Sequence, residues 1–154
     1  MTVRFYYPIA ASVLILTLSA AAQEKKIERT SLPPVVEKAV SAQTRGATIK
    51  GFAEEREQGK TFYEVETVLN GHTRDILFSP DGSVAEIEEE VAFAALPANV
   101  QAGLTKKAAG AKITKVESLT KKGKLVAYEA NVQKGTKSSE IQVGPEGNNL
   151  AHEE

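Results

Sequence analysis

The chain offers few side chains of the types that carry out covalent catalysis. It contains no cysteine, which excludes thiol nucleophiles, disulfides and cysteine-ligated metal sites. Its two histidines, His72 and His152, have no partner at a recognised metal-ligand spacing. The sequence also lacks the motifs of serine hydrolases, zinc proteases, phosphate loops and dinucleotide sites. We therefore expect a protein that is not an enzyme, with no catalytic residue, no metal and no cofactor.

Carboxylates are the reactive groups that the sequence does gather. They cluster at Glu54-Glu55-Arg56-Glu57 and at Glu86–Glu90. If the second cluster is a strand, Glu86, Glu88 and Glu90 share one face, where they could hold a hard cation such as calcium. No loop rich in Asp or Asn completes such a site. The sequence therefore favours a solvated edge strand, whose charge discourages aggregation.

Basic residues are grouped as well, at Lys106-Lys107, Lys121-Lys122 and Lys124. Their places in the pattern predict a solvated helix end and a hairpin. The whole chain has a formal net charge of −1, whereas nucleic-acid-binding proteins are usually basic. With 42% hydrophobic and 25% charged residues the composition is that of a globular protein, and no nucleic-acid partner is expected.

Residues 1–22 have the pattern of a secretory signal peptide. Arg4 precedes an almost wholly apolar stretch from Phe5 to Leu18, and Ala20–Ala22 supplies a small-residue cleavage site. The alternative is an uncleaved anchor, since the apolar stretch approaches the length of a membrane span. Cleavage after Ala22 predicts an exported protein, periplasmic or extracellular, with no further membrane contact. The charged residues 23–30 are expected to form a disordered leader.

The remaining chain reads as two units of similar sequence, 31–91 and 95–154. Leu32–Val40 matches Leu96–Leu104 at an offset of 64. After one insertion, Tyr63-Glu64-Val65 matches Tyr128-Glu129-Ala130, and Pro80-Asp81-Gly82 matches Pro145-Glu146-Gly147. Because the order of these features is kept, the sequence predicts an internal tandem repeat.

Each unit predicts one helix followed by four strands. Apolar residues four apart, such as Val36 and Val40, give the helix its buried stripe, and Asn70-Gly71 predicts a tight hairpin. The expected strands are 47–53, 61–69, 73–78 and 83–89 in the first unit and 111–119, 125–133, 139–143 and 148–152 in the second. The expected fold class is α+β, a tandem repeat of one helix packed on a four-stranded antiparallel sheet.

Alternation along these strands predicts which side chains face away from the helix. If Tyr63, Val65 and Ile76 point inward, an apolar patch is left on the open sheet face among Glu and Lys. Such patches often mark binding sites, and we expect this one to bind a partner. Its members are Phe52, Phe62, Val68 and Leu77. Alternatively, the other unit or a second copy of the chain covers them, because a small unit needs extra burial.

The order of these motifs resembles the PepSY-like domain family, exported bacterial domains described as beta-lactamase-inhibitor-like. Helix, turn and core positions carry the resemblance: Leu32, Pro33, Val36, Ala39, Val40, Gly46, Ala47, Ile49, Tyr63, Glu64, Val65, Phe78, Asp81, Gly82 and Val84, with Leu96, Pro97, Val100, Leu104, Gly110, Ala111, Ile113, Tyr128, Glu129, Pro145 and Gly147 in the second unit. The resemblance implies a repeated helix on a four-stranded antiparallel sheet. It also implies an exported, non-enzymatic protein of the inhibitor or sensor type, and supplies no ligand set.

Two functions stay open on the sequence alone. The first is an exported, non-catalytic binding protein that takes an exported protein or peptide on its open sheet face, with inhibition of an exported enzyme as one form of that binding. The second is an envelope sensor of a small ligand or cation. A broad apolar patch favours the first, and a concave pocket or converging carboxylates favour the second.

Overall fold

The computed structural model describes residues 23–57 and 59–154. Eight strands form a single antiparallel sheet in the order β1-β2-β3-β4-β5-β6-β7-β8, so each strand pairs with its neighbours in sequence. The elements are β1 (Gln23–Lys26), η1 (Arg29–Ser31), α1 (Pro34–Gln43), β2 (Thr48–Glu57), β3 (Lys60–Leu69), β4 (His72–Phe78), β5 (Val84–Glu90), η2 (Phe93–Ala95), α2 (Ala98–Ala108), β6 (Lys112–Lys121), β7 (Lys124–Lys134) and β8 (Lys137–Val143). The predicted signal peptide, residues 1–22, lies outside the described residues.

The single sheet corrects the expected fold class. A tandem repeat of one helix on a four-stranded sheet is wrong, because β5 pairs with β6 and joins both units into one eight-stranded sheet. Residues 148–152, expected to form a last strand, lie outside the strands. The physical reason is burial: separate small sheets would each leave open edges and bury little surface, and the β5–β6 ladder removes two of those edges.

Residues 23–30 are ordered, although a disordered leader was expected. β1 pairs with β2 and places Lys25 opposite Glu54, a favourable cross-strand charge pair. Ile27 then packs against the core beneath α1, and its amide donates to the carbonyl of Phe52 at 3.0 Å. Because β1 carries mostly charged side chains, its sequence shows no apolar alternation, and the strand is recognisable only beside its partner.

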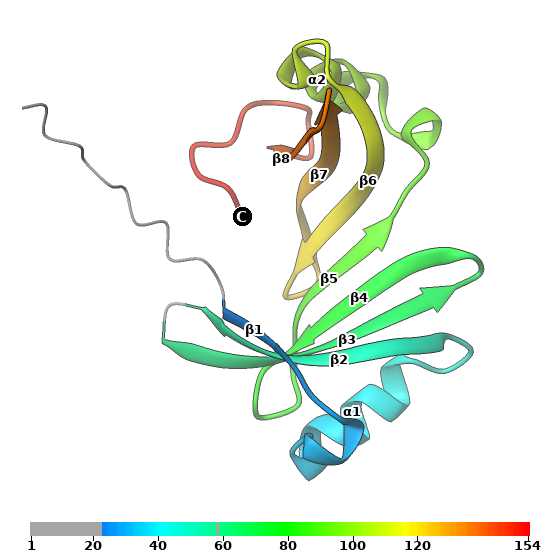
Figure 1. Cartoon of the computed structure of the whole chain (residues 1–154), viewed down its shortest axis with the longest axis vertical. Helices are drawn as coiled ribbons and strands as arrows, with labels where there is room; N and C mark the ends of the chain where they lie inside the picture. The colour runs from blue at the N-terminus through cyan, green and yellow to red at the C-terminus, as the bar shows by residue number, and fades with distance from the viewer. Residues whose placement is uncertain (1–22, 58) are drawn as a thin grey trace, which may run out of the picture.

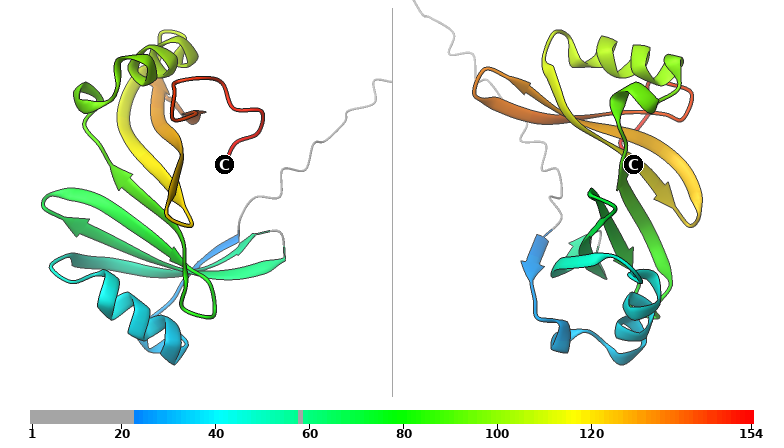
Figure 2. Two further views of the ribbon diagram at one scale, coloured as in Figure 1. Left: turned by 180° about the vertical axis from the view of Figure 1, so that it is seen from behind. Right: turned by 90° about the vertical axis from the view of Figure 1, so that its right-hand side faces the viewer.

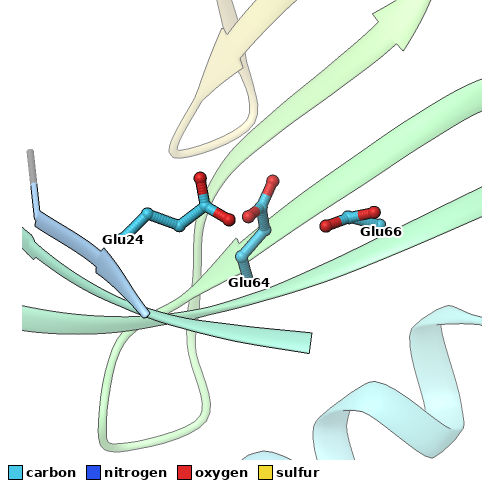
Figure 3. Close-up of side chains that lie close together, drawn as sticks. All are labelled: Glu24, Glu64 and Glu66. Carbon is cyan, nitrogen blue, oxygen red and sulfur yellow. The ribbon is translucent and has the colours of Figure 1, made fainter. Parts of the chain in front are cut away.

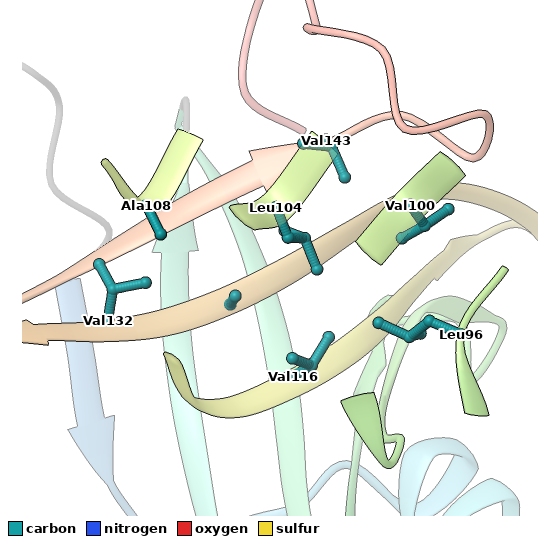
Figure 4. Packing of buried hydrophobic residues seen from close by; sticks show 8 residues of the cluster. Leu96, Val100, Leu104, Ala108, Val116, Val132 and Val143 are labelled. Carbon is teal, nitrogen blue, oxygen red and sulfur yellow. The ribbon is translucent and has the colours of Figure 1, made fainter. Parts of the chain in front are cut away.

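Both helices lie on the outer side of a bent sheet, at opposite ends of the molecule (Figures 1 and 2). Beneath α1, Val36 and Val40 pack against a cluster on β3 and β4. Beneath α2, Val100, Leu104 and Ala108 pack against β6, β7 and β8 (Figure 4). We call β1–β5 with α1 the first half, and α2 with β6–β8 the second half. Within the described ranges, no helix has the length and apolar character needed to cross a membrane.

A glycine turn fixes each helix to the end of the strands below it. Gly82 has φ 82° and lies against the backbone of Val35 in α1, and Gly147 has φ 74° and lies against the backbone of Asn99 in α2. The side-chain amide of Asn99 also donates to the carbonyl of Glu146 at 3.0 Å. The matched turns predicted at 80–82 and 145–147 therefore serve as helix contacts in both halves.

Candidate functional site

The inner face of the bent sheet, opposite the helices, is lined with carboxylates. Along each strand they alternate with side chains that face the helices, as the pairing registers require. They are Glu24 on β1, Glu55 on β2, Glu64 and Glu66 on β3, Asp75 on β4, Glu86 and Glu88 on β5, Glu117 on β6 and Glu129 on β7. We call this set the acidic face.

Two groups on the acidic face converge closely. Oxygen atoms of Glu24, Glu64 and Glu66 lie within 4.8 Å of one another, and Figure 3 shows these side chains approaching each other above β2. A second group joins Asp75, Glu88 and Glu117 across three strands, again within 4.8 Å. Like charges at this separation repel one another, so each group favours a ligand or a proton that removes charge.

Small residues on β2 make room for the first group. Gly51 pairs with Glu66, and Ala53 pairs with Glu64. A methyl group added at Gly51 would lie 3.3 Å from the carboxylate of Glu66, so this carboxylate occupies the space above the glycine. Because Gly51 and Ala53 are small, carboxylates from β1 and β3 can approach each other over β2.

Burial and crowding change the proton affinity of the acidic face. Burial, followed by the charges of Glu55 and Asp75, raises the pKa of Glu64 to about 8. Burial, followed by the charges of Glu86 and Glu117, raises the pKa of Glu88 to about 8. At neutral pH both carboxyls therefore hold protons, which a bound cation would displace.

In the second half, carboxylates of the acidic face have polar or basic side chains as partners. The Lys115 ammonium lies 2.6 Å from Oε1 of the buried Glu117, and the Gln142 amide donates to Glu129 at 2.8 Å. The backbone amide of Glu154 donates to Oε1 of Gln142 at 2.8 Å, which brings the end of the chain to the inner face (Figure 1). In the first half, Glu24, Glu64 and Glu66 face other carboxylates.

Two neighbouring hollows open on the inner face. A cavity of about 120 Å³ is lined mainly by carboxylates, among them Glu55, Glu64, Asp75 and Glu88. Beside it lies a larger recess of about 530 Å³, which we call the apolar recess. Its apolar lining is Phe62, Leu77, Val84 and Ala85, and its polar lining is Glu57, Lys60, Ser79, Ser83, Glu86, Lys121 and Lys122. The two hollows share Glu57, Leu77, Glu86 and Lys121, so they adjoin one another.

The four residues of the predicted apolar patch are separated in the structure. Phe62 and Leu77 come together in the apolar recess. Val68 pairs with Thr73 near the opposite end of β3. Phe52 packs against the core beneath α1, because a bulge between Ile49 and Gly51 shifts the register of β2 and turns its side chain to the helix side. Strict alternation from Ile49 cannot predict this reversal.

The acidic strand Glu86–Glu90 is an interior strand, whereas a solvated edge strand was expected. β5 pairs with β4 on one side and β6 on the other. Glu86 and Glu88 belong to the acidic face, and Glu90 accepts a hydrogen bond from the backbone amide of Thr73 at 3.0 Å. The sequence did contain a signal for the acidic face: Glu64 and Glu66 alternate with Val65, and Glu86 and Glu88 alternate with Ile87.

The remaining sequence candidates occupy surface positions. His72 begins β4 and is exposed, with Nδ1 4.0 Å from a carboxylate oxygen of Glu90. His152 is exposed near the end of the chain. Lys106 and Lys107 occupy the last turn of α2, and the amine of Lys107 donates to the carbonyl of Gln142 at 2.9 Å. The predicted helix end and hairpin for the lysines agree with these positions.

Comparison with known proteins identifies the fold. No family model matches the chain, and no curated protein sequence matches it. Among solved structures, a candidate periplasmic protein from Bacteroides eggerthii is 18% identical with a TM-score of 0.61, covering 75% of this chain and 84% of its own. A BLIP-like protein from Bacteroides fragilis is 20% identical with a TM-score of 0.56, covering 80% and 86%. A DUF2874 family protein from Bacteroides uniformis is 14% identical with a TM-score of 0.59, covering 78% and 86%. These likenesses support a BLIP-like fold.

Proposed function

We propose that the chain is an exported, non-catalytic binding protein of the PepSY-like type, located in the periplasm, and that its acidic face takes a basic segment of another exported polypeptide. The signal-peptide pattern and the fold shared with a candidate periplasmic protein support the location. The acidic face supports the ligand class, and it is the observation that carries the proposal.

The arrangement of the acidic face suits ammonium and guanidinium groups. Its carboxylates are spread over neighbouring strands, so a basic segment can place several side chains on them at once. The carboxylate-lined cavity, at about 120 Å³, has room for one cationic head group but is small beside typical small-molecule sites. Charge-assisted hydrogen bonds from Lys or Arg to partly buried carboxylates are among the stronger polar contacts in proteins.

The test is titration of the purified protein into a fluorescein-labelled peptide of four arginines flanked by glycines, followed by fluorescence anisotropy. We expect Glu88→Gln to weaken binding about fivefold or more, because Gln cannot ionise to pair with arginine. Glu89→Gln is the matched control: it changes the next residue of the same strand, which points to the helix side. Equal binding by both variants would contradict the proposal.

A second candidate is a divalent cation such as Ca²⁺, and the two close carboxylate groups favour it. A cation site predicts that Ca²⁺ alone raises the melting temperature, and that Glu66→Gln abolishes this rise. Release of protons on binding, measured in a weakly buffered solution, would accompany either ligand because Glu64 and Glu88 must ionise. A rise with Ca²⁺ but no binding of the arginine peptide would select the cation sensor.

A further inference from the structure

We propose that the apolar recess is a second subsite for the same polypeptide ligand, and that it takes a large apolar side chain and a neighbouring carboxylate. This inference rests on the proposed function and adds the ligand's residue pattern: an aromatic or long aliphatic residue that lies between a basic residue and an acidic residue.

The position of the recess is the first argument. It lies where β3 begins, β4 ends and β5 begins, beside the turn that joins β6 and β7. It shares Leu77 and Glu86 with the carboxylate-lined cavity. A ligand whose cationic group occupies that cavity can therefore extend directly into the recess.

The chemistry of the lining is the second argument. Phe62 and Leu77 present apolar surface, and covering it with another apolar side chain is favourable. The recess contains the three lysines Lys60, Lys121 and Lys122 beside the two glutamates Glu57 and Glu86, a formal excess of one positive charge, whereas carboxylates dominate the adjoining cavity. Lys121 is paired with Glu86 at 3.5 Å, which leaves Lys60 and Lys122 as the lysines placed to meet a ligand carboxylate.

The backbone around the recess is held in place, which favours a preformed subsite. The amide of Lys122 donates to the carbonyl of Ala85 at 3.1 Å and fixes the β6–β7 turn against β5. On the opposite side, the amide of Gly82 donates to Ser79 and that of Ser79 to Ser83, each at 2.9 Å. A subsite with a fixed wall costs little ordering free energy when it binds.

The experiment compares labelled peptides by fluorescence anisotropy on the purified protein. The parent peptide has two arginines, one phenylalanine and one aspartate separated by glycines; in the others, alanine replaces phenylalanine, asparagine replaces aspartate, or glutamines replace both arginines. We expect loss of phenylalanine to weaken binding about tenfold, as for an anchor residue, and loss of aspartate to weaken it about threefold. Phe62→Ser should abolish the advantage of phenylalanine, and Lys60→Gln that of aspartate.

The outcomes separate the two proposals. If the peptide with alanine binds as tightly as the parent, and only loss of arginine matters, the subsite is refuted while the acidic face stands. If no arginine-containing peptide binds, the proposed function itself fails. Because Phe62 is half-buried, Lys60→Gln provides a variant that leaves the core intact, and far-ultraviolet circular dichroism checks the fold of Phe62→Ser.

Discussion

The two halves of the molecule are alike on the helix side and different on the inner side. Under each helix, apolar residues four apart on the helix pack against apolar side chains of the strands. On the inner face, Glu64 of the first half is surrounded by carboxylates, whereas Glu129, at the matching position of the second half, accepts a hydrogen bond from Gln142. The helix side is thus constrained by packing, whereas the charge pattern of the inner side differs between the two halves.

The prediction with the largest expected effect on stability concerns the turn glycines Gly82 and Gly147. We expect Gly147→Ala to lower the free energy of unfolding by about 3 kcal/mol or more, because a methyl group would overlap the carbonyl of Asn99 at a positive φ. Gly82→Ala should cost about 1–2 kcal/mol, since the methyl group would lie 3.0 Å from Val35. Urea unfolding followed by circular dichroism measures both.

Gly135→Ala is the control for these two variants. Gly135 has φ 63° and nothing within 4 Å of an added methyl group, so its cost is that of the left-handed backbone alone, about 1 kcal/mol. If all three variants lost the same free energy, close contact between turn and helix would not be what makes Gly82 and Gly147 costly to replace.

The next test uses the matched carboxylates. The pKa of Glu64 rises from 4.5 to about 8 on folding, so the stability that its proton provides is fully present below pH 4.5 and is lost as the pH rises through 8. After allowance for solvent screening this amounts to about 1–2 kcal/mol. The melting temperature of the wild type should therefore fall as the pH rises from 4.5 to about 8, and level off by pH 9.

Glu64→Gln should flatten this fall and be more stable than the wild type at pH 9. Glu129→Gln should change the slope less, because the hydrogen bond from Gln142 opposes the effect of burial on the pKa of Glu129. Thermal melts of the wild type and the two variants across this pH range measure how the melting temperature of each depends on pH. Identical slopes for all three would show that the two inner faces titrate alike.

The prediction with the smallest expected effect on stability removes a contact that is present in the first half and absent from the second. Arg29 donates to both Glu37 and Ser41 of α1 at 2.8 Å, and all three side chains are exposed. At the position matching Glu37 the second half has Gln101, whose amide donates to the carbonyl of Leu96. Arg29→Ala should leave the midpoint of urea unfolding almost unchanged, and a clear drop would show that this pair is more than a solvent-screened contact.

Much of the local structure could be predicted from the sequence. Both helices follow from apolar residues four apart, and the hairpins follow from turns such as Asn70-Gly71, because these signals depend on neighbouring residues only. Fold class could not be predicted, because the sequence gives no sign that β5 would pair with β6. β1 was missed for a related reason: its charged side chains are stabilised by β2, not by their own pattern.

The candidate site was harder to predict than the fold. Phe62 and Leu77 were selected for their exposure on the open face, and the recess does bring them together. Phe52 was misplaced by a single bulge, which alternation cannot foresee. The acidic face was split between two clusters in the sequence. Its convergence depends on the pairing registers, on the bend of the sheet and on the small residues Gly51 and Ala53.

The strand order has a consequence for how this protein reaches its native state. Every strand pairs with the one before it, but the β1–β2 and β5–β6 ladders each have a helix between their two strands. The other ladders are hairpins, and pairings between adjacent segments form faster than those that close long loops. As the chain emerges from its N-terminus onward, each new strand meets an edge already formed. Continuous growth would keep unpaired edges, which promote aggregation, few and short-lived.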